Sequence, residues 1–128
     1  MSYYFSKMIE APFADAVARV KAALSTEGFG VLTEIDVAAT MKAKLGAEMA
    51  PYLILGACNP KLAHDALQVE DKIGLMLPCN VIVQSRGDNR TEVSAIDPVA
   101  SMQAIDNSPL KQAAALVQAK LKTVIEGL

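Results

Sequence analysis

The fold and the candidate site both depend on residues 53–83, whose sequence is LILGACNPKLAHDALQVEDKIGLMLPCNVIV. This stretch holds both cysteines, the only histidine and two of the six prolines. The run Tyr52–Cys58 is apolar and follows Pro51, which is typical of a strand that is buried on both faces. We therefore expect a central strand at this position.

A helix is predicted directly after this strand. Asn59 is a favourable N-cap, and Pro60 suits the first helical position because it lacks the N–H that would be unpaired there. The helix is expected to run from Pro60 to about Glu70. The N–H groups of its first turn would lie next to Cys58, where their partial positive charge favours a thiolate or holds an anion. Cys58 is therefore predicted to be the more reactive of the two thiols.

Lys72–Val83 is predicted to form the next strand. Its apolar residues share one parity and would face the core: Ile73, Leu75, Leu77, Cys79, Val81 and Val83. Pro78 cannot donate a hydrogen bond in a strand ladder, so we expect it at an edge, at a bulge or where one strand ends and another begins. A proline and an asparagine accompany each cysteine, in Cys58–Pro60 and in Pro78–Asn80. We expect these two interruptions of regular secondary structure to lie at the same end of the sheet and to bring the cysteines together.

Apolar periodicity and turn residues predict the remaining elements. Strands are expected at 3–9, 29–35 and 90–96, and helices are expected up to about residue 27, between 36 and 46, and from 109 to 128. Gly87–Asn89 is a turn signal that would join the last two strands as an antiparallel hairpin. Residues 99–105 are ambiguous between a loop and a single helical turn. The chain is thus predicted to be one α+β domain spanning residues 1–128.

Composition narrows the class of protein. Hydrophobic residues make up 52% of the 128 residues and charged residues 20%, which suits a single domain with its own core. The net charge is −2 and no Lys/Arg-rich run is present, so we expect neither a nucleic-acid surface nor binding to an anionic membrane. No apolar run approaches the roughly 20 residues of a membrane-spanning helix. The N-terminal residues do not resemble a signal peptide, so a cytoplasmic location with reduced thiols is expected.

Four motifs connect the chain to a known family: Gly28–Asp36, Leu55–Pro60 followed by Ala63-His64, Leu77–Val81, and Ala95–Pro98. In these motifs and in the order of its elements, the chain resembles the bacterial and archaeal domain-of-unknown-function family 302 over nearly its whole length. The resemblance implies a two-layer α+β sandwich of the TATA-binding-protein-like type, with a curved, mainly antiparallel sheet packed against helices. It implies no activity and no cofactor, and an acidic chain does not support DNA binding.

The leading functional hypothesis is a module that binds a small ligand or a soft metal. Its candidate ligand-binding residues are Gly56, Cys58, Asn59, His64, Cys79 and Asn80. For a metal, the candidate ligands are Cys58, His64 and Cys79, with Asp97 as a further donor. The sequence does not name a cofactor, and the paired C-x-x-C spacing of structural zinc sites is absent from it.

Two alternatives stay open. The chain could be a thiol enzyme with Cys58 as nucleophile and His64 as its base, if their side chains meet. It could instead be a structural domain that forms a homodimer, because a sheet with helices on one face leaves its other face, or an exposed edge, to be covered by a second copy. Each candidate also has an ordinary explanation: Cys79 as a core residue, His64 on a polar helix face, and Asp97 as a turn former before a proline.

Overall fold

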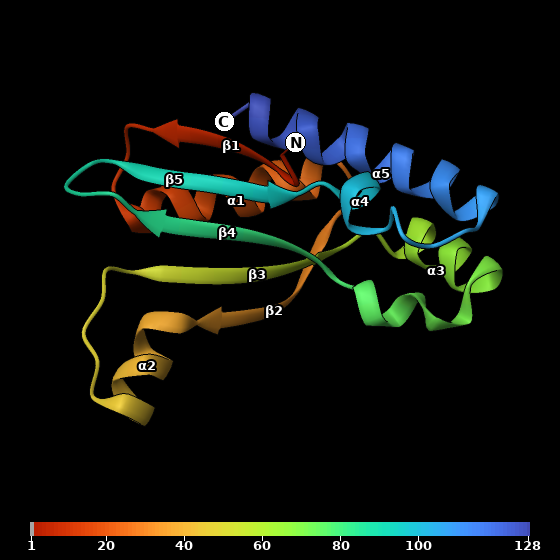
Figure 1. Cartoon of the computed structure of the whole chain (residues 1–128). Coiled ribbons are helices and arrows are strands. Elements are labelled where there is room, and N and C mark those ends of the chain that lie inside the picture. Colours follow the sequence, from red (N-terminus) through yellow and green to blue (C-terminus); the bar gives the residue numbers. More distant parts are fainter. Residues whose placement is uncertain (1) are drawn as a thin grey trace.

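Five strands form one antiparallel sheet in the computed structural model of the chain, which describes residues 2–128 (Figure 1). The strands are β1 (Tyr4–Ile9), β2 (Gly30–Asp36), β3 (Tyr52–Cys58), β4 (Cys79–Ser85) and β5 (Thr91–Ile96). Their order across the sheet is β1-β5-β4-β3-β2, so β3 is an interior strand, as expected. Met1, which the expected domain includes, lies outside the described residues.

The described part of the chain contains five α-helices. They are α1 (Phe13–Thr26), α2 (Val37–Leu45), α3 (Pro60–Val69), α4 (Pro98–Ser101) and α5 (Ser108–Glu126). Two of them, α2 and α3, start at the capping residues Asp36 and Asn59, as the sequence indicates. Asp36 caps α2 by accepting a hydrogen bond from the Ala39 N–H over 2.9 Å, and Gly46 ends α2 with a φ of 67°. These local signals therefore located both ends of α2.

The main core lies between one face of the sheet and the helices α1 and α5. The inward row of the central strands is fully buried and includes Leu55, Val81, Val83, Val93 and Ala95. These side chains pack against Val20 and Leu24 of α1 and Leu121 of α5. The protein is thus an α+β fold with a helical layer on one face of an antiparallel sheet, as the sequence predicted.

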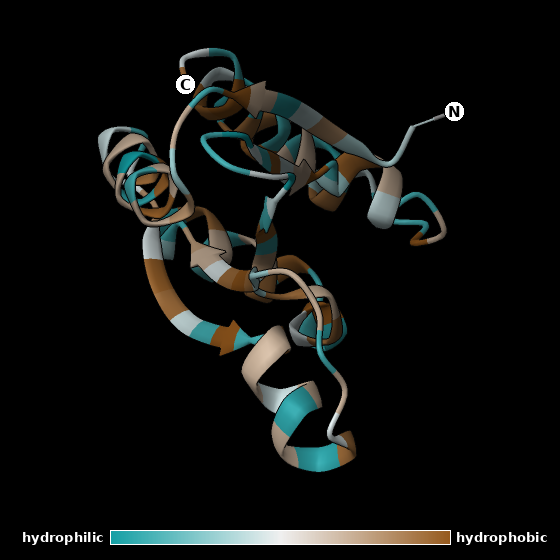
Figure 2. Cartoon of the chain, turned by 90° about the vertical axis from the view of Figure 1, so that its left-hand side faces the viewer, coloured by the Kyte–Doolittle hydropathy of each residue, from teal (hydrophilic) through white to brown (hydrophobic). Residues whose placement is uncertain are grey.

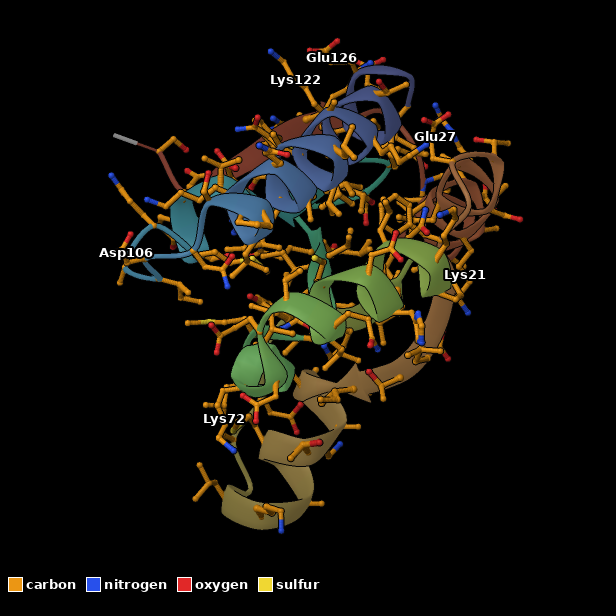
Figure 3. All side chains as sticks on the ribbon, turned by 90° about the vertical axis from the view of Figure 1, so that its right-hand side faces the viewer. Lys21, Glu27, Lys72, Asp106, Lys122 and Glu126 are labelled. Carbon is orange, nitrogen blue, oxygen red and sulfur yellow. The ribbon has the colours of Figure 1, made fainter. Side chains whose placement is uncertain are left out.

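A smaller core lies beyond one end of the sheet. It combines residues of α3, of the following 3-10 segment and of α5 with Met102, which directly follows α4; its members are Ala66, Ile73, Met102, Leu110 and Ala114. Figure 3 shows α3 beside α5 with side chains filling the space between them. At the opposite end of the sheet, α2 projects away from the rest of the chain and has no buried residue (Figure 2). The end of the sheet beside α3 and α5, not the end beside α2, therefore holds the space next to the cysteines.

The strand predicted for Lys72–Val83 is only half correct. Asp71–Met76 forms a 3-10 helix, and strand pairing starts at Cys79. Within this segment, Ile73 is buried whereas Leu75 is 85% exposed, so the row of alternating apolar residues does not face one core. Pro78 has no N–H to donate to a ladder, and a short alternating run does not distinguish a strand from one tight helical turn.

Among residues 2–128, no helix combines the length and the apolar character that crossing a membrane requires.

Candidate functional site

The two cysteines are brought to the same end of the sheet by the pairing of β3 with β4. Ala57 pairs with Cys79 in this register, so Cys58 lies one residue beyond the paired position. Pro78 immediately precedes β4, as expected for a residue that cannot join a ladder. Both cysteines are free thiols and line one cavity between the sheet, α3 and α5.

This cavity is small and apolar. Its volume is about 30 Å³, which is room for about one water molecule. Apart from Asn59, its lining is apolar or sulfur-bearing, with Phe29 and Leu62 on one side and Leu110 and Val117 on the other. A cavity of this size holds no small organic ligand unless α3 moves away from α5.

The two thiols differ in burial. Cys79 is only 7% exposed, and burial together with the nearby Cys58 raises the pKa of its thiol to about 11. Cys79 is therefore a neutral core side chain near neutral pH. Cys58 is half-buried and is the more accessible thiol of the two.

His64 does not join the cysteines. Ala63 and Ala66 line the cavity, whereas His64 lies on the exposed side of α3, with its Nε2 3.5 Å from the Gln68 side-chain amide. The reason is helical geometry, because consecutive residues are rotated by about 100° around the helix axis. The expected pairing of Cys58 with His64 as its base is therefore not formed.

The proposed metal ligands are not assembled either. Among residues 2–128, no three histidine, cysteine, aspartate or glutamate side chains are placed to hold a metal ion together. Asp97 is engaged elsewhere: its Oδ1 accepts hydrogen bonds from the Val99 N–H at the start of α4 and from Gln118 Nε2, both over 3.0 Å. Cys58, His64 and Cys79 consequently do not form the expected three-ligand centre.

Asn59 and Gly56 have structural roles. Asn59 caps α3 by accepting from the Leu62 N–H over 3.3 Å, and its amide donates to the Glu27 carbonyl over 3.4 Å. Gly56 leaves no space for a ligand, because a Cβ at this position would clash with Thr33 Oγ1 and would lie 2.7 Å from Pro78 Cγ. Gly56 is thus required for close packing within the sheet.

Asn80 belongs to a different site on the sheet face that α1 and α5 leave uncovered. It is paired with Gly56 and lines a surface depression of about 450 Å³. The depression extends over β1, β3, β4 and β5 and is lined by Tyr3, Tyr4, Tyr52, Asn80, Ile82, Gln84, Arg86, Glu92, Ser94, Ala95 and Ile96. All three tyrosines of the chain are in this set.

A hydrogen-bonded cluster lies at this depression. Glu92 accepts from Ser6 Oγ at Oε2 over 2.8 Å and from Arg86 Nε at Oε1 over 2.9 Å. Ser6 Oγ also lies 2.8 Å from Ser94 Oγ. The hydrogen bonds from Ser6 and Arg86 hold the pKa of the Glu92 carboxyl below its ordinary value. The side chains at this end of the depression are therefore oriented by one another.

Comparison with known proteins identifies the family. The sequence model of the family described as "Domain of unknown function DUF302" matches residues 5–128. The chain belongs to the DUF302 family. Its structure is similar to the crystal structure of an uncharacterized conserved DUF302 protein from Bacillus stearothermophilus, with a TM-score of 0.90, 24% identity and coverage of 98% of each chain. At that identity the likeness supports the shared fold. No curated protein matches this chain.

Sequence reasoning missed most of the depression in this DUF302 chain. It selected Asn80 but not Arg86, Glu92 or Ser94, which come from the β4–β5 hairpin. The alternation in Thr91–Ile96 places Glu92 and Ser94 on the face opposite Val93 and Ala95. This alternation is the sequence pattern that could have placed Glu92 and Ser94 on the uncovered face. Recognising it as a site requires the pairing of β5 with β1, which supplies Ser6.

Proposed function

We propose that this DUF302 domain is a binding module for a small molecule, and that its site is the depression on the uncovered sheet face. The observation that supports this proposal is the combination of size and lining. The depression measures about 450 Å³, within the range of about 300–1,000 Å³ for small-molecule sites. Its aromatic and aliphatic wall carries a few oriented polar groups, as such sites do.

The proposal keeps the function expected from the sequence but moves the site. The cavity beside Cys58 and Cys79 is too small for a ligand, and neither a metal centre nor a Cys58–His64 pair is formed there. Soft-metal binding and thiol catalysis are therefore not part of the proposal. The cytoplasm stays the expected location, since two free thiols suit a reducing compartment.

Nuclear magnetic resonance of the ¹⁵N-labelled protein tests this assignment. Addition of a mixture of aromatic and polar fragments should shift the amide signals of Tyr52, Ile82 and Ser94, which line the depression. The variant Asn80→Trp should abolish these shifts, because Asn80 is exposed within the depression and an indole would fill it. The matched variant Gln112→Trp, at an exposed position of α5, should leave them unchanged.

Two results of this experiment would contradict the proposed site. Fragment-induced shifts confined to α3 and α5 would place the ligand in the cavity near the cysteines and contradict the proposal. Shifts that persist in Asn80→Trp would contradict it as well.

The second candidate function is homodimerisation through the uncovered face. It is favoured by exposed apolar side chains there: Tyr4 is 44% exposed, Met8 41% and Ile35 48%. Soluble monomers rarely leave a wide apolar surface uncovered, and a two-fold contact between copies would hide it.

Light scattering over a wide concentration range tests the dimer. A dimer requires a mass of twice 13.6 kDa, and Met8→Glu should restore the monomer mass. Leu116→Glu, at a 57% exposed position of α5, is the control and should not change the mass. A constant mass of 13.6 kDa for the unmodified chain would rule this candidate out.

A further inference from the structure

We infer that the ligand of the depression is a small aromatic carboxylate, and that the guanidinium of Arg86 is its anchor. This inference rests on the proposed function, because it names the class of molecule that the same site would take.

Hydrogen bonding within the cluster leaves donors without partners. Each oxygen of the Glu92 carboxylate already accepts a hydrogen bond, one from Ser6 and one from Arg86. Arg86 uses only its Nε in side-chain hydrogen bonds to the described residues. Its two terminal amino groups therefore remain available in a side chain that is 47% exposed at the rim of the depression. A ligand that supplies acceptor oxygens fits this surplus of donors.

The geometry of Arg86 selects a planar acceptor with two oxygens. A guanidinium can bind a carboxylate side-on, through Nε and one terminal amino group, or end-on, through both terminal amino groups, which form its terminal fork. The Nε side is occupied by Glu92, so the terminal fork is the remaining bidentate surface. Glu92 also limits the rotation of the guanidinium, which reduces the entropy lost when a ligand binds. Arg86 is thus pre-oriented to bind a carboxylate end-on.

The rest of the lining suits an aromatic ring. Tyr3 and Tyr4 are packed edge to face, with ring centroids 5.1 Å apart and an angle of 72° between the rings. Tyr52 from β3 and the aliphatic Ile82 and Ile96 complete an apolar wall. Aromatic rings pack against one another in edge-to-face and offset arrangements, and this contact removes apolar surface from water. Tyr52 is paired with Gln84 and Gln84 with Glu92, so Tyr52 lies at the Arg86 end of the depression, whereas Tyr4 is paired with Ile96 at the other end. A ring attached to the carboxylate would therefore be desolvated against Tyr52 and Ile82.

Charge limits the ligand to a single negative group. The charge of Glu92 offsets that of Arg86, and the whole chain has a net charge of −2. Long-range attraction of a polyanion is consequently weak, and selectivity depends on the hydrogen bonds of the fork. A monocarboxylate matches this local balance better than a phosphate ester does.

Binding of defined probes tests the inference. Benzoate, 3-phenylpropionate and indole-3-acetate are titrated into the ¹⁵N-labelled protein, alongside benzamide as a neutral isostere and acetate as an aliphatic carboxylate. The aromatic carboxylates should bind at least about tenfold more tightly than benzamide or acetate, in line with a charge-assisted bidentate contact. The shifted amides should lie around Tyr52 and Ser94.

Variants isolate the role of the fork. Arg86→Gln should weaken benzoate binding by about tenfold or more, and Arg86→Lys should weaken it too, because lysine keeps the charge but lacks the fork. Arg90→Gln is the matched control, since Arg90 lies in the same hairpin but outside the depression. Its benzoate affinity should equal that of the unmodified chain.

Three results would overturn the inference. Equal affinity for benzamide and benzoate would show that the ligand class is wrong while the site itself stands. Equal losses in Arg86→Gln and Arg90→Gln would remove Arg86 as the anchor. If the fragment mixture and all five probes leave the depression unperturbed, the proposed function fails together with the inference.

Discussion

Arg86 and Glu92 are joined across the β4–β5 hairpin by a hydrogen bond of 2.9 Å from Nε to Oε1. Ser6 of the neighbouring strand β1 donates to the other oxygen of the same carboxylate. Two strands, β1 and β5, and the β4–β5 turn therefore contribute to one polar cluster on a sheet face that α1 and α5 do not cover. This cluster gives that face directed hydrogen-bonding groups in addition to its exposed apolar side chains.

The lowered pKa of Glu92 predicts a contribution to stability that depends on pH. A carboxylate whose pKa is lower in the folded state than in the unfolded state stabilises the fold above the unfolded value and loses this effect as the pH falls. The ordinary value is 4.5 and the folded value is lower, so the contribution is complete at neutral pH and disappears in the acid range. Glu92→Gln should therefore reduce the urea midpoint at pH 7, and this reduction should shrink as the pH falls below 4.5. The exposed Glu10→Gln is the control, and parallel behaviour of the two variants would contradict the prediction.

Cys58 should react with iodoacetamide much faster than Cys79. Burial raises the pKa of the Cys79 thiol to about 11, so roughly a thousandth of it is thiolate at about pH 8, and its 7% exposure limits access further. Mass spectrometry of tryptic peptides over time measures both rates. His64→Ala should leave the Cys58 rate unchanged, because His64 is on the exposed side of α3. Slower alkylation of Cys58 in that variant would instead support the hypothesis that His64 acts as a base for Cys58.

Gly56→Ala should destabilise the fold. The new methyl group would overlap Thr33 Oγ1 and lie 2.7 Å from Pro78 Cγ, so strands must shift. Overpacking of this kind lowers the free energy of unfolding by about 1–3 kcal/mol. Gly74→Ala is the matched control, since a Cβ there meets nothing within 4 Å, and its effect should stay within about 0.5 kcal/mol. The double variant Gly56→Ala with Thr33→Ala should recover part of the loss in urea unfolding. A Gly56→Ala protein as stable as Gly74→Ala would refute the packing role.

Asn59 should contribute to stability through the start of α3. Asn59→Ala removes the cap on the Leu62 N–H and the hydrogen bond to the Glu27 carbonyl, and should cost about 1–2 kcal/mol in the free energy of unfolding. Asn59→Asp keeps the capping oxygen but loses the amide donor, so its loss should be smaller. Thermal unfolding of both variants measures the difference. Equal stability of the alanine variant and the unmodified chain would show that the cap is dispensable.

Much of the fold could be predicted because its signals are local. Asp36 and Gly46 mark the ends of α2, and Asn59 with Pro60 marks the start of α3, since capping is decided within one helical turn. The motifs from Gly28 to Pro98 were sufficient to indicate the family that the comparison confirmed. The prediction failed where a local pattern was ambiguous, in Ile73–Leu77, because Ile73 is buried in a cluster with residues of α3 and α5 and not beside a neighbouring strand.

The candidate site was less predictable, because a site depends on which side chains share one face. The sequence by itself determined the strands β1, β2, β3 and β5, the caps of α2 and α3, and the position of both cysteines next to Asn59 and Pro78. Only the tertiary structure decided that α3 turns His64 outward and that β1, β5 and the β4–β5 turn bring Ser6, Glu92 and Arg86 together. The physical reason is that strand order and helix packing bring together residues that are up to 86 positions apart, and no local pattern in the chain encodes that pairing.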